Sequence, residues 1–305
     1  MYFPYLRGRQ FELIAIRELI DNNCISPNIV PIIEPVRASS TLTSTLSKCN
    51  ERHQPIAFII NPNVGTFVKE FNSFDKRKDL LSSIINDNVI KAYIVDDKIS
   101  GIEERLFKFN SSVDKALFIF NKSDFIEKYN SAIGVNIAKF NLIPDERDFR
   151  RGIHKHRVIL SDVFHMQDRN SDYPEEPEVF STDHLYYYDD GYLGFSDYSI
   201  VGNKFLEAGF APYCLVIHIV YFDEKKQLMI KHFRSKSNED ATDPANKFRE
   251  ALESLLLWNE TAKLDTYAIR QFKNFYKNGD YPGLGTIKKL SIMHHIELIN
   301  DYLIG

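Results

Sequence analysis

Short apolar runs recur along the first two hundred positions, and amphipathic, helix-like segments of similar size separate most of them. Runs such as Ile29–Glu34 and Ile56–Asn61 are apolar on both faces, as strands covered by helices on both sides must be. Strands that alternate with helices predict a parallel sheet, and eight such units close a (β/α)₈ barrel. The eight runs end, in chain order, on Arg7, Glu34, Asn61, Asp96, Asn121, Lys139, Asp162 and Asp197.

The pattern changes after these units. Leu215–Phe222 and Leu228–Arg234 read as two strands joined by a short charged turn, which predicts a hairpin. Three helices then close the chain, and the first begins with Asp243 as N-cap and Pro244 at the first helical position. We therefore expect an α/β fold, a TIM-like (β/α)₈ barrel with a C-terminal α+β appendage made of a β-hairpin and three helices.

The expected division places the barrel in residues 1–205 and the appendage in residues 206–305. Between the seventh and eighth runs lies a stretch, 166–190, that is rich in Asp, Glu, Pro and Tyr and lacks a clear period. Such a stretch is either a lid over the barrel mouth or a solvated insertion. Both faces of the strand at 215–222 are largely apolar, so both need cover, from the terminal helices or from a second chain. A homo-oligomer is one expectation that follows.

Composition narrows the function classes. The chain has 305 residues, 44% hydrophobic content and a net charge of −4, which argues against a general affinity for nucleic acid. Its three cysteines lack a CxxC pair, and no apolar stretch approaches the roughly 18 residues that cross a bilayer. The opening residues do not follow the pattern of a secretory signal. We expect a cytoplasmic protein without membrane contact.

The carboxyl ends of barrel strands form the mouth where TIM barrels carry their active sites. Clustered carboxylates at the mouth could hold Mg²⁺ or Mn²⁺, because hard cations prefer oxygen ligands, and the candidate metal ligands are Glu34, Asp162 and Asp197. Arg7 and Lys139 could instead clamp a phosphate or a carboxylate. The candidate catalytic residues are Glu34, Asp162, Asp197 and Lys139. The candidate ligand-binding residues are Arg7, Asn61, Asp96, Asn121 and His165.

Two readings of these residues compete. Asp162 with His165, three positions later, could form a general-base pair. Alternatively, Asn and Asp after a strand are ordinary turn and N-cap residues. Arg7, Glu34 and Lys139 are poor turn residues, which favours a functional role for them.

Segments along the whole chain resemble the beta protein family, known from tailed phages and from bacteria. The opening Tyr2–Glu12 (YFPYLRGRQFE) and Pro31–Pro35 (PIIEP) carry the resemblance to the family. Gly194–Ser199, His218–Tyr221 and Gly283–Lys289 look like a bacterial branch encoded beside a nuclease-like neighbour. On the matching positions the resemblance points to Arg7, Glu12, Glu34 and Asp197. It implies a role in defence or as mobile-element cargo, without a defined chemistry.

Three functional hypotheses follow. The leading one is a component of a bacterial defence module against phage or foreign DNA, which acts with a nuclease-like partner and binds a phosphate-bearing ligand or nucleotide at the barrel mouth. The second is a stand-alone, metal-assisted phosphoester hydrolase. The third is a catalytically inactive barrel that serves as a scaffold.

Overall fold

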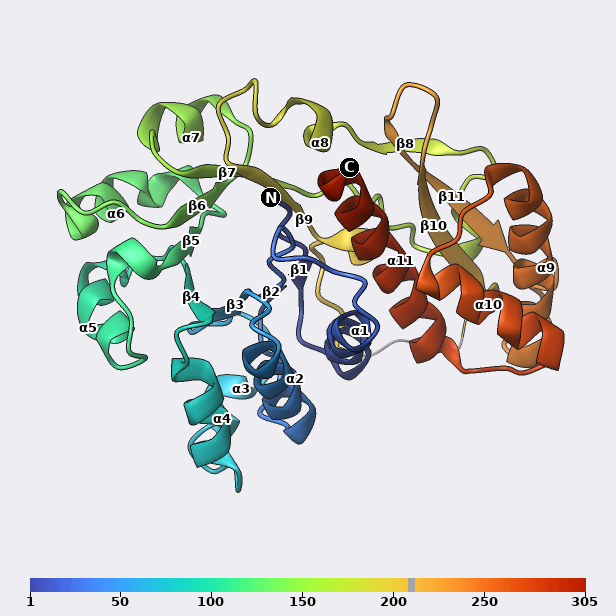
Figure 1. Ribbon diagram of the computed structural model, residues 1–305, viewed down its shortest axis with the longest axis horizontal. Helices are drawn as coiled ribbons and strands as arrows, with labels where there is room; N and C mark the ends of the chain where they lie inside the picture. The colour runs from blue at the N-terminus through green and yellow to red at the C-terminus, as the bar shows by residue number, and fades with distance from the viewer. Residues whose placement is uncertain (208–211) are drawn as a thin grey trace.

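The computed structural model describes residues 1–207 and 212–305, and its main body is a ring of parallel strands with helices around it (Figure 1). The eight strands pair in chain order, and every pairing is parallel. The strands are β1 (Tyr5–Leu6), β2 (Ile32–Ile33), β3 (Ile56–Ile59), β4 (Val89–Ile94), β5 (Leu117–Ile119), β6 (Phe140–Ile143), β7 (Arg157–Ser161) and β9 (Gly194–Asp197). The predicted TIM-like barrel is confirmed.

The first and last strands meet at a seam that nearly closes the barrel. The Phe3 N–H donates to the Phe195 carbonyl (2.9 Å), and the Phe195 N–H donates to the Met1 carbonyl (3.1 Å). Gly194 lies against this seam so closely that a Cβ there would approach the Met1 carbonyl oxygen to 2.5 Å. A side chain at position 194 would therefore force the two ends of the sheet apart.

Helices follow the barrel strands as the alternating pattern predicts. Their bounds are α1 (Gln10–Asp21), α2 (Ser40–Glu51), α3 (Phe67–Glu70), α4 (Arg77–Ile85), α5 (Ile102–Phe107), α6 (Ile126–Ile133) and α7 (Arg147–Gly152). In α1 the apolar side chains Leu13, Ile16 and Ile20 recur every three or four residues and are buried against the barrel wall. A Ser39 N-cap, which accepts from the Leu42 N–H at 3.1 Å, starts α2.

The strand period of two divides the barrel side chains into two buried clusters. Tyr5, Ile32, Ala57 and Leu160 belong to a cluster that fills the barrel interior. Their chain neighbours, such as Leu6, belong to a larger cluster between the barrel wall and the surrounding helices. Because side chains alternate between the two faces of a strand, this parity fixes which residues at a strand end point into the mouth.

The appendage contains a second, antiparallel sheet in the order β10-β11-β8. The predicted hairpin is confirmed as β10 (Val216–Phe222) and β11 (Leu228–Arg234). The third strand, β8 (Glu178–Ser181), comes from the stretch between the seventh and eighth barrel strands and is followed by α8 (Asp183–Tyr186). Part of that stretch therefore belongs to the appendage sheet, so it is not simply a lid or a solvated insertion.

Three helices complete the appendage: α9 (Pro244–Ala262), α10 (Tyr267–Asn278) and α11 (Leu284–Ile304). The predicted start of α9 is confirmed, since the Asp243 side chain accepts from the Asn246 N–H (3.0 Å). On the hairpin, Tyr221 stacks edge-on against Trp258 of α9 (5.0 Å between ring centroids), and Phe222 contacts Tyr302 of α11 (5.2 Å). The chain's own helices thus cover both faces of β10.

Helix α11 also packs along α1 and beside the barrel seam (Figure 1). Two contacts hold it there: Ser199 Oγ, just after β9, lies 3.0 Å from His295 Nδ1 in the interior, and the partly buried Lys289 pairs with Glu18 of α1 at 2.6 Å. Helix α11 therefore takes the place of an eighth barrel helix, although it comes from the far end of the sequence. Strand β8 precedes residue 205 but pairs with the appendage sheet, and α11 follows residue 205 but packs on the barrel. The division of the chain at residue 205 stays a prediction.

Candidate functional site

Most of the predicted mouth residues lie at the carboxyl ends of the barrel strands. Six of the eight come one or two residues after the end of a barrel strand: Arg7, Glu34, Asn61, Asp96, Asn121 and Asp162. Lys139 and Asp197 are placed differently, and they change the chemistry of the candidate site.

Lys139 lies at the opposite end of the barrel from the mouth. Strand β6 starts at Phe140, one residue after Lys139, and the Lys139 N–H donates to the Ala116 carbonyl (3.0 Å) just before β5. The prediction placed this strand too early, because the polar residue Asn141 interrupts its apolar pattern. The Asn141 amide faces outward, where it accepts from Tyr129 Oη at 2.6 Å. The mouth therefore lacks the lysine that was expected to help clamp an anion.

Asp197 is the last residue of β9, but its side chain points to the outer side of the barrel wall. Its neighbour Ser196 faces the opposite way and donates to the Phe3 carbonyl (2.6 Å). Asp197 Oδ1 accepts from Tyr2 Oη (2.8 Å) and from the Ser199 N–H (2.7 Å), and Oδ2 lies 3.8 Å from His295 Nε2 of α11. Burial raises the pKa of Asp197 to about 6. Asp197 thus serves the contact between the barrel and α11.

The centre of the mouth is an ion pair between Arg7 and Glu34. Glu34 is fully buried; Oε2 accepts from Arg7 and from Tyr5 Oη (2.7 Å), and Oε1 accepts from the Asn63 N–H (2.8 Å). The Arg7 guanidinium lies over the Tyr5 ring (5.1 Å to the centroid) and the Tyr198 ring (5.4 Å). Burial lowers the pKa of Arg7, but Tyr5 and Glu34 outweigh it, so the pKa is raised overall.

One polar atom of this cluster has no partner. Arg7 Nε is buried without a hydrogen bond to any residue that the structure describes. Six other buried side-chain atoms of the described residues also lack a partner, among them Arg17 Nε and Arg157 Nε, so the position of Arg7 at the barrel mouth is what singles it out. The sequence pattern pointed to Arg7 and Glu34 but not to Tyr5 and Tyr198. Tyr5 could have been found from the strand period, since it lies two residues before Arg7 and faces the same way.

Asp162 and His165 lie near each other without a hydrogen bond between their side chains. Asp162 Oδ1 accepts from the Asn203 N–H at 3.1 Å, and both Asp162 and His165 are exposed. Burial of part of its surface raises the pKa of Asp162 overall, although the Asn203 bond and the nearby His165 and Arg7 act in the opposite direction. The predicted general-base pair is not formed, but Asp162 belongs to the edge of the mouth.

The other mouth residues are occupied by local structure. Asn61 makes two hydrogen bonds with the backbone of Ile94 (2.8 and 2.9 Å), which extend the pairing of β3 with β4. Asp96 accepts from Tyr93 Oη (2.7 Å) and from the Lys98 N–H (3.0 Å), as turn aspartates do. Asn121 is exposed, with no side-chain hydrogen bond to the described residues. For Asp96 the turn interpretation is the better one, whereas Asn61 serves the pairing of β3 with β4.

The three carboxylates predicted to hold Mg²⁺ or Mn²⁺ do not converge. Glu34 is saturated by three donors, Asp162 lies at the rim, and Asp197 faces the outer side of the wall. Within residues 1–207 and 212–305, no group of three or more His, Cys, Asp or Glu side chains is arranged to hold a metal ion. The donor set therefore does not fit the predicted metal site.

Asp145 occupies the position at the end of β6 that Lys139 was expected to fill. Its Oδ1 accepts from Tyr192 Oη and from Arg150, both at 2.6 Å. Burial raises its pKa, but these two hydrogen bonds lower it overall. The correct end of β6, at Ile143-Pro144, would have identified Asp145 from the sequence.

Glu12, which the resemblance singled out, lies in the first turn of α1 and is 1% exposed. Lys288 of α11 approaches its Oε1 to 3.6 Å, beyond hydrogen-bond distance. Burial lowers the pKa of Lys288, and Glu12 partly restores it. This pair ties α11 to α1 beside the mouth.

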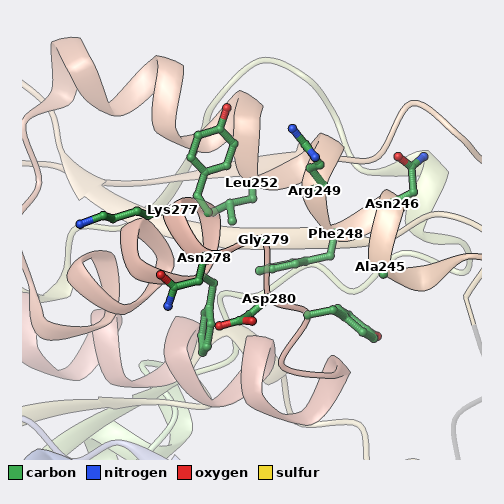
Figure 2. Close-up of a pocket in the computed structure, with 12 residues that line it drawn as sticks. Ala245, Asn246, Phe248, Arg249, Leu252, Lys277, Asn278, Gly279 and Asp280 are labelled. Atoms are coloured by element: carbon green, nitrogen blue, oxygen red, sulfur yellow. The ribbon is translucent and has the colours of Figure 1, made fainter.

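A separate hollow of about 510 Å³ lies in the appendage between α9 and the end of α10. Figure 2 shows Phe248 pointing into it, whereas the Lys277 side chain extends away. Arg249, at its rim, pairs with Glu253 of the same helix at 3.1 Å. Its lining has no buried charged group, so the mouth around Arg7 is the better candidate site.

Comparison with known proteins adds no assignment: no protein-family model matches the chain, and no curated protein matches it. Over the described residues, none of the helices combines the length and the apolar character needed to span a bilayer. The geometry of the mouth is therefore the basis for a functional proposal.

Proposed function

We propose that the protein binds a phosphate-bearing small molecule at the barrel mouth and acts, with a nuclease-like partner, in a bacterial defence module. The observation that carries the binding part is Arg7. It projects into the mouth with its Nε buried and unpartnered among the described residues. An arginine fork matches phosphate geometry, and ligands of TIM barrels bind at this face.

The surroundings of Arg7 make it a fixed, charged donor. Tyr5, Glu34 and Tyr198 surround the guanidinium on several sides. A side chain held in this way loses less entropy when it binds a ligand than a free one does. Glu34 orients Arg7 and neutralises it, so the expected ligand binds weakly to moderately unless further cations contribute.

The two alternatives are less well supported. A metal-assisted hydrolase needs a metal-holding carboxylate group, and the predicted residues do not converge. An inactive scaffold would need no polar group aimed into the mouth, whereas Arg7 Nε has no described partner there. Scaffold function remains the outcome to be expected if no ligand binds.

Titration calorimetry with ATP and with inorganic phosphate tests the binding proposal. Arg7→Gln alone would leave Glu34 buried and unpaired, so the informative variant is the double substitution Arg7→Gln with Glu34→Gln, which removes both charges. We expect it to weaken ATP binding at least tenfold. Arg52→Gln, at an exposed position beyond α2, is the matched control and should bind as the wild type does. Equal binding by all three proteins, or by none, would refute the proposal.

The defence part rests on the resemblance of the opening and later segments to the beta protein family. Plaque counts on a phage-sensitive host test it, with the chain expressed alone, with its neighbouring gene, and with the neighbour plus the double variant. We expect protection only from the intact pair, and co-elution of the two proteins in size-exclusion chromatography. Protection that persists with the double variant would separate defence from ligand binding.

A further inference from the structure

Residues Gly202–Glu207, here called the strap, pass over the edge of the mouth after β9. Both polar backbone groups of Asn203 are held: its N–H by Asp162 Oδ1 at 3.1 Å, and its carbonyl by Arg7. Further along, the Leu206 carbonyl accepts from Arg9. The strap is thus bound to the carboxyl ends of β1 and β7 through two arginines and an aspartate.

Arg9 and the exposed Lys204 of the strap are cations of this region that form no ion pair with the described part of the chain, and Arg9 is the one beside the mouth arginine Arg7. Arg7 pairs with Glu34, and Lys288 pairs with Glu12. Arg9 forms no ion pair with the described part of the chain; instead, its guanidinium lies 4.6 Å from the centroid of the Phe205 ring. Its charge is therefore available for an anion, and the strap itself supplies its present contacts.

The strap offers both arginines neutral carbonyl oxygens. A phosphate oxygen accepts a charge-assisted hydrogen bond, which is roughly twice as strong as the bond to a neutral acceptor. The strap also starts at Gly202, whose φ of +74° lies in the left-handed region and whose added Cβ would meet the Phe164 carbonyl oxygen at 3.4 Å. A glycine at this point permits a sharp change of direction between β9 and the strap.

We propose that Arg9 is the second cation of the anion site and that the strap is an autoinhibitory contact, whose Asn203 and Leu206 carbonyls occupy the arginines that the ligand needs. This inference rests on the proposed function of the mouth. Phosphate oxygens replace the two carbonyls, and the strap is released from the mouth as the ligand binds. Apparent affinity then equals the intrinsic affinity reduced by the fraction of molecules with an open strap.

Weakening the strap without touching the arginines should therefore tighten binding. Phe205→Ala removes the ring under Arg9, a contact whose loss should raise the open fraction about three- to fivefold. We expect the affinity for inorganic pyrophosphate and for ATP to rise by the same factor. Phe107→Ala, at a position of α5 that is 80% exposed, is the matched control and should leave affinity unchanged. Arg9→Gln should lower the affinity about tenfold although it also frees the strap.

Hydrogen exchange provides an independent readout. Backbone amides of residues 202–207 should exchange faster when pyrophosphate is added to the wild type, and faster without ligand in Phe205→Ala. If Phe205→Ala binds no tighter while the double variant of Arg7 and Glu34 loses binding, the strap is refuted and the mouth site stands. If Arg9→Gln binds as the wild type does, its role is refuted. If no protein binds either probe, both the site and the strap are refuted.

Discussion

Substituting Asp197 with asparagine should stabilise the protein, by an amount that grows as the pH rises from about 4 to about 6. The carboxylate is buried between the barrel wall and α11, and burial raises its pKa from 3.8 to about 6. A carboxyl with a raised pKa in the folded state contributes stability below its unfolded pKa and loses it as the pH rises through the folded value. At pH 8 the ionised group therefore costs the fold free energy that a neutral amide would not.

The magnitude follows from the shift. A rise from 3.8 to about 6 corresponds to about 3 kcal/mol at about 1.4 kcal/mol per pKa unit, which is the upper limit of the gain. The amide oxygen of asparagine can keep the bonds from Tyr2 Oη and the Ser199 N–H. Its amide nitrogen would face His295 Nε2, which is buried without a hydrogen bond to the described residues. We expect a gain of about 1–3 kcal/mol at pH 8.

Chemical denaturation of wild type and Asp197→Asn between pH 4 and pH 8 measures the effect. The difference in unfolding free energy should be largest above pH 6 and should fall steeply toward pH 4, where the folded carboxyl is protonated and the unfolded one is about half ionised. Asp197→Ala, which removes the acceptor of two buried hydrogen bonds, should be less stable than the wild type at every pH by about 1–3 kcal/mol. Glu224→Gln, at an exposed position in the hairpin turn, is the matched control and should show no pH-dependent difference. An asparagine variant that is less stable at pH 8, or equally stabilised at pH 4 and pH 8, would contradict this reasoning.

Three further predictions follow from buried groups. Burial lowers the pKa of His294 to about 4 and of His295 to about 3, so the unfolded chain binds more protons below pH 6.5. Each histidine should cost about 1.4 kcal/mol of stability per pH unit between pH 6 and 4.5, and His294→Gln should flatten that slope by one such increment in denaturant titrations. Gly285→Ala should lower the melting temperature by several degrees, because its Cβ would approach a ring carbon of Phe11 to 2.1 Å, where α11 meets α1; an unchanged melting temperature would show that the partly exposed Phe11 ring moves aside. Burial raises the pKa of Cys49 to about 12, so native protein should resist iodoacetamide at pH 8 at this site by mass spectrometry, whereas denatured protein should react.

The sequence predicted the barrel because its evidence is local. Each strand is a short apolar run, and the apolar side chains of α1 recur every three or four residues, as the predicted amphipathic segments do. The hairpin and the start of α9 also follow from adjacent residues, a charged turn in one case and the Asp243-Pro244 pair in the other. Where a structural feature depends on neighbours in the chain, periodicity and capping are sufficient.

The site was predicted less well, because the side of the barrel wall to which a side chain points depends on the register of its strand. The residues of β9 are buried on both faces, so the sequence offers no alternation to show that Asp197 points outward while Ser196 points inward. An apolar run one strand-length too early placed Lys139 at the wrong end of β6. A one-residue error in a strand reverses the face of each side chain, and an error of several residues reverses the end of the barrel.

The positions of β8 and α11 depend on contacts between residues that lie far apart in the sequence. Strand β8 is short and follows a proline, and it becomes a strand only because β11 offers an edge to pair with. Helix α11 covers the seam between the first and last barrel strands, a position that no local pattern could assign to residues 284–304. Lys288 and His295 of this helix face Glu12 and Asp197, which lie just beyond β1 and at the end of β9. The strap connects the same two regions across the mouth, so a change in the strap or in α11 has a direct physical route to the groups around Arg7.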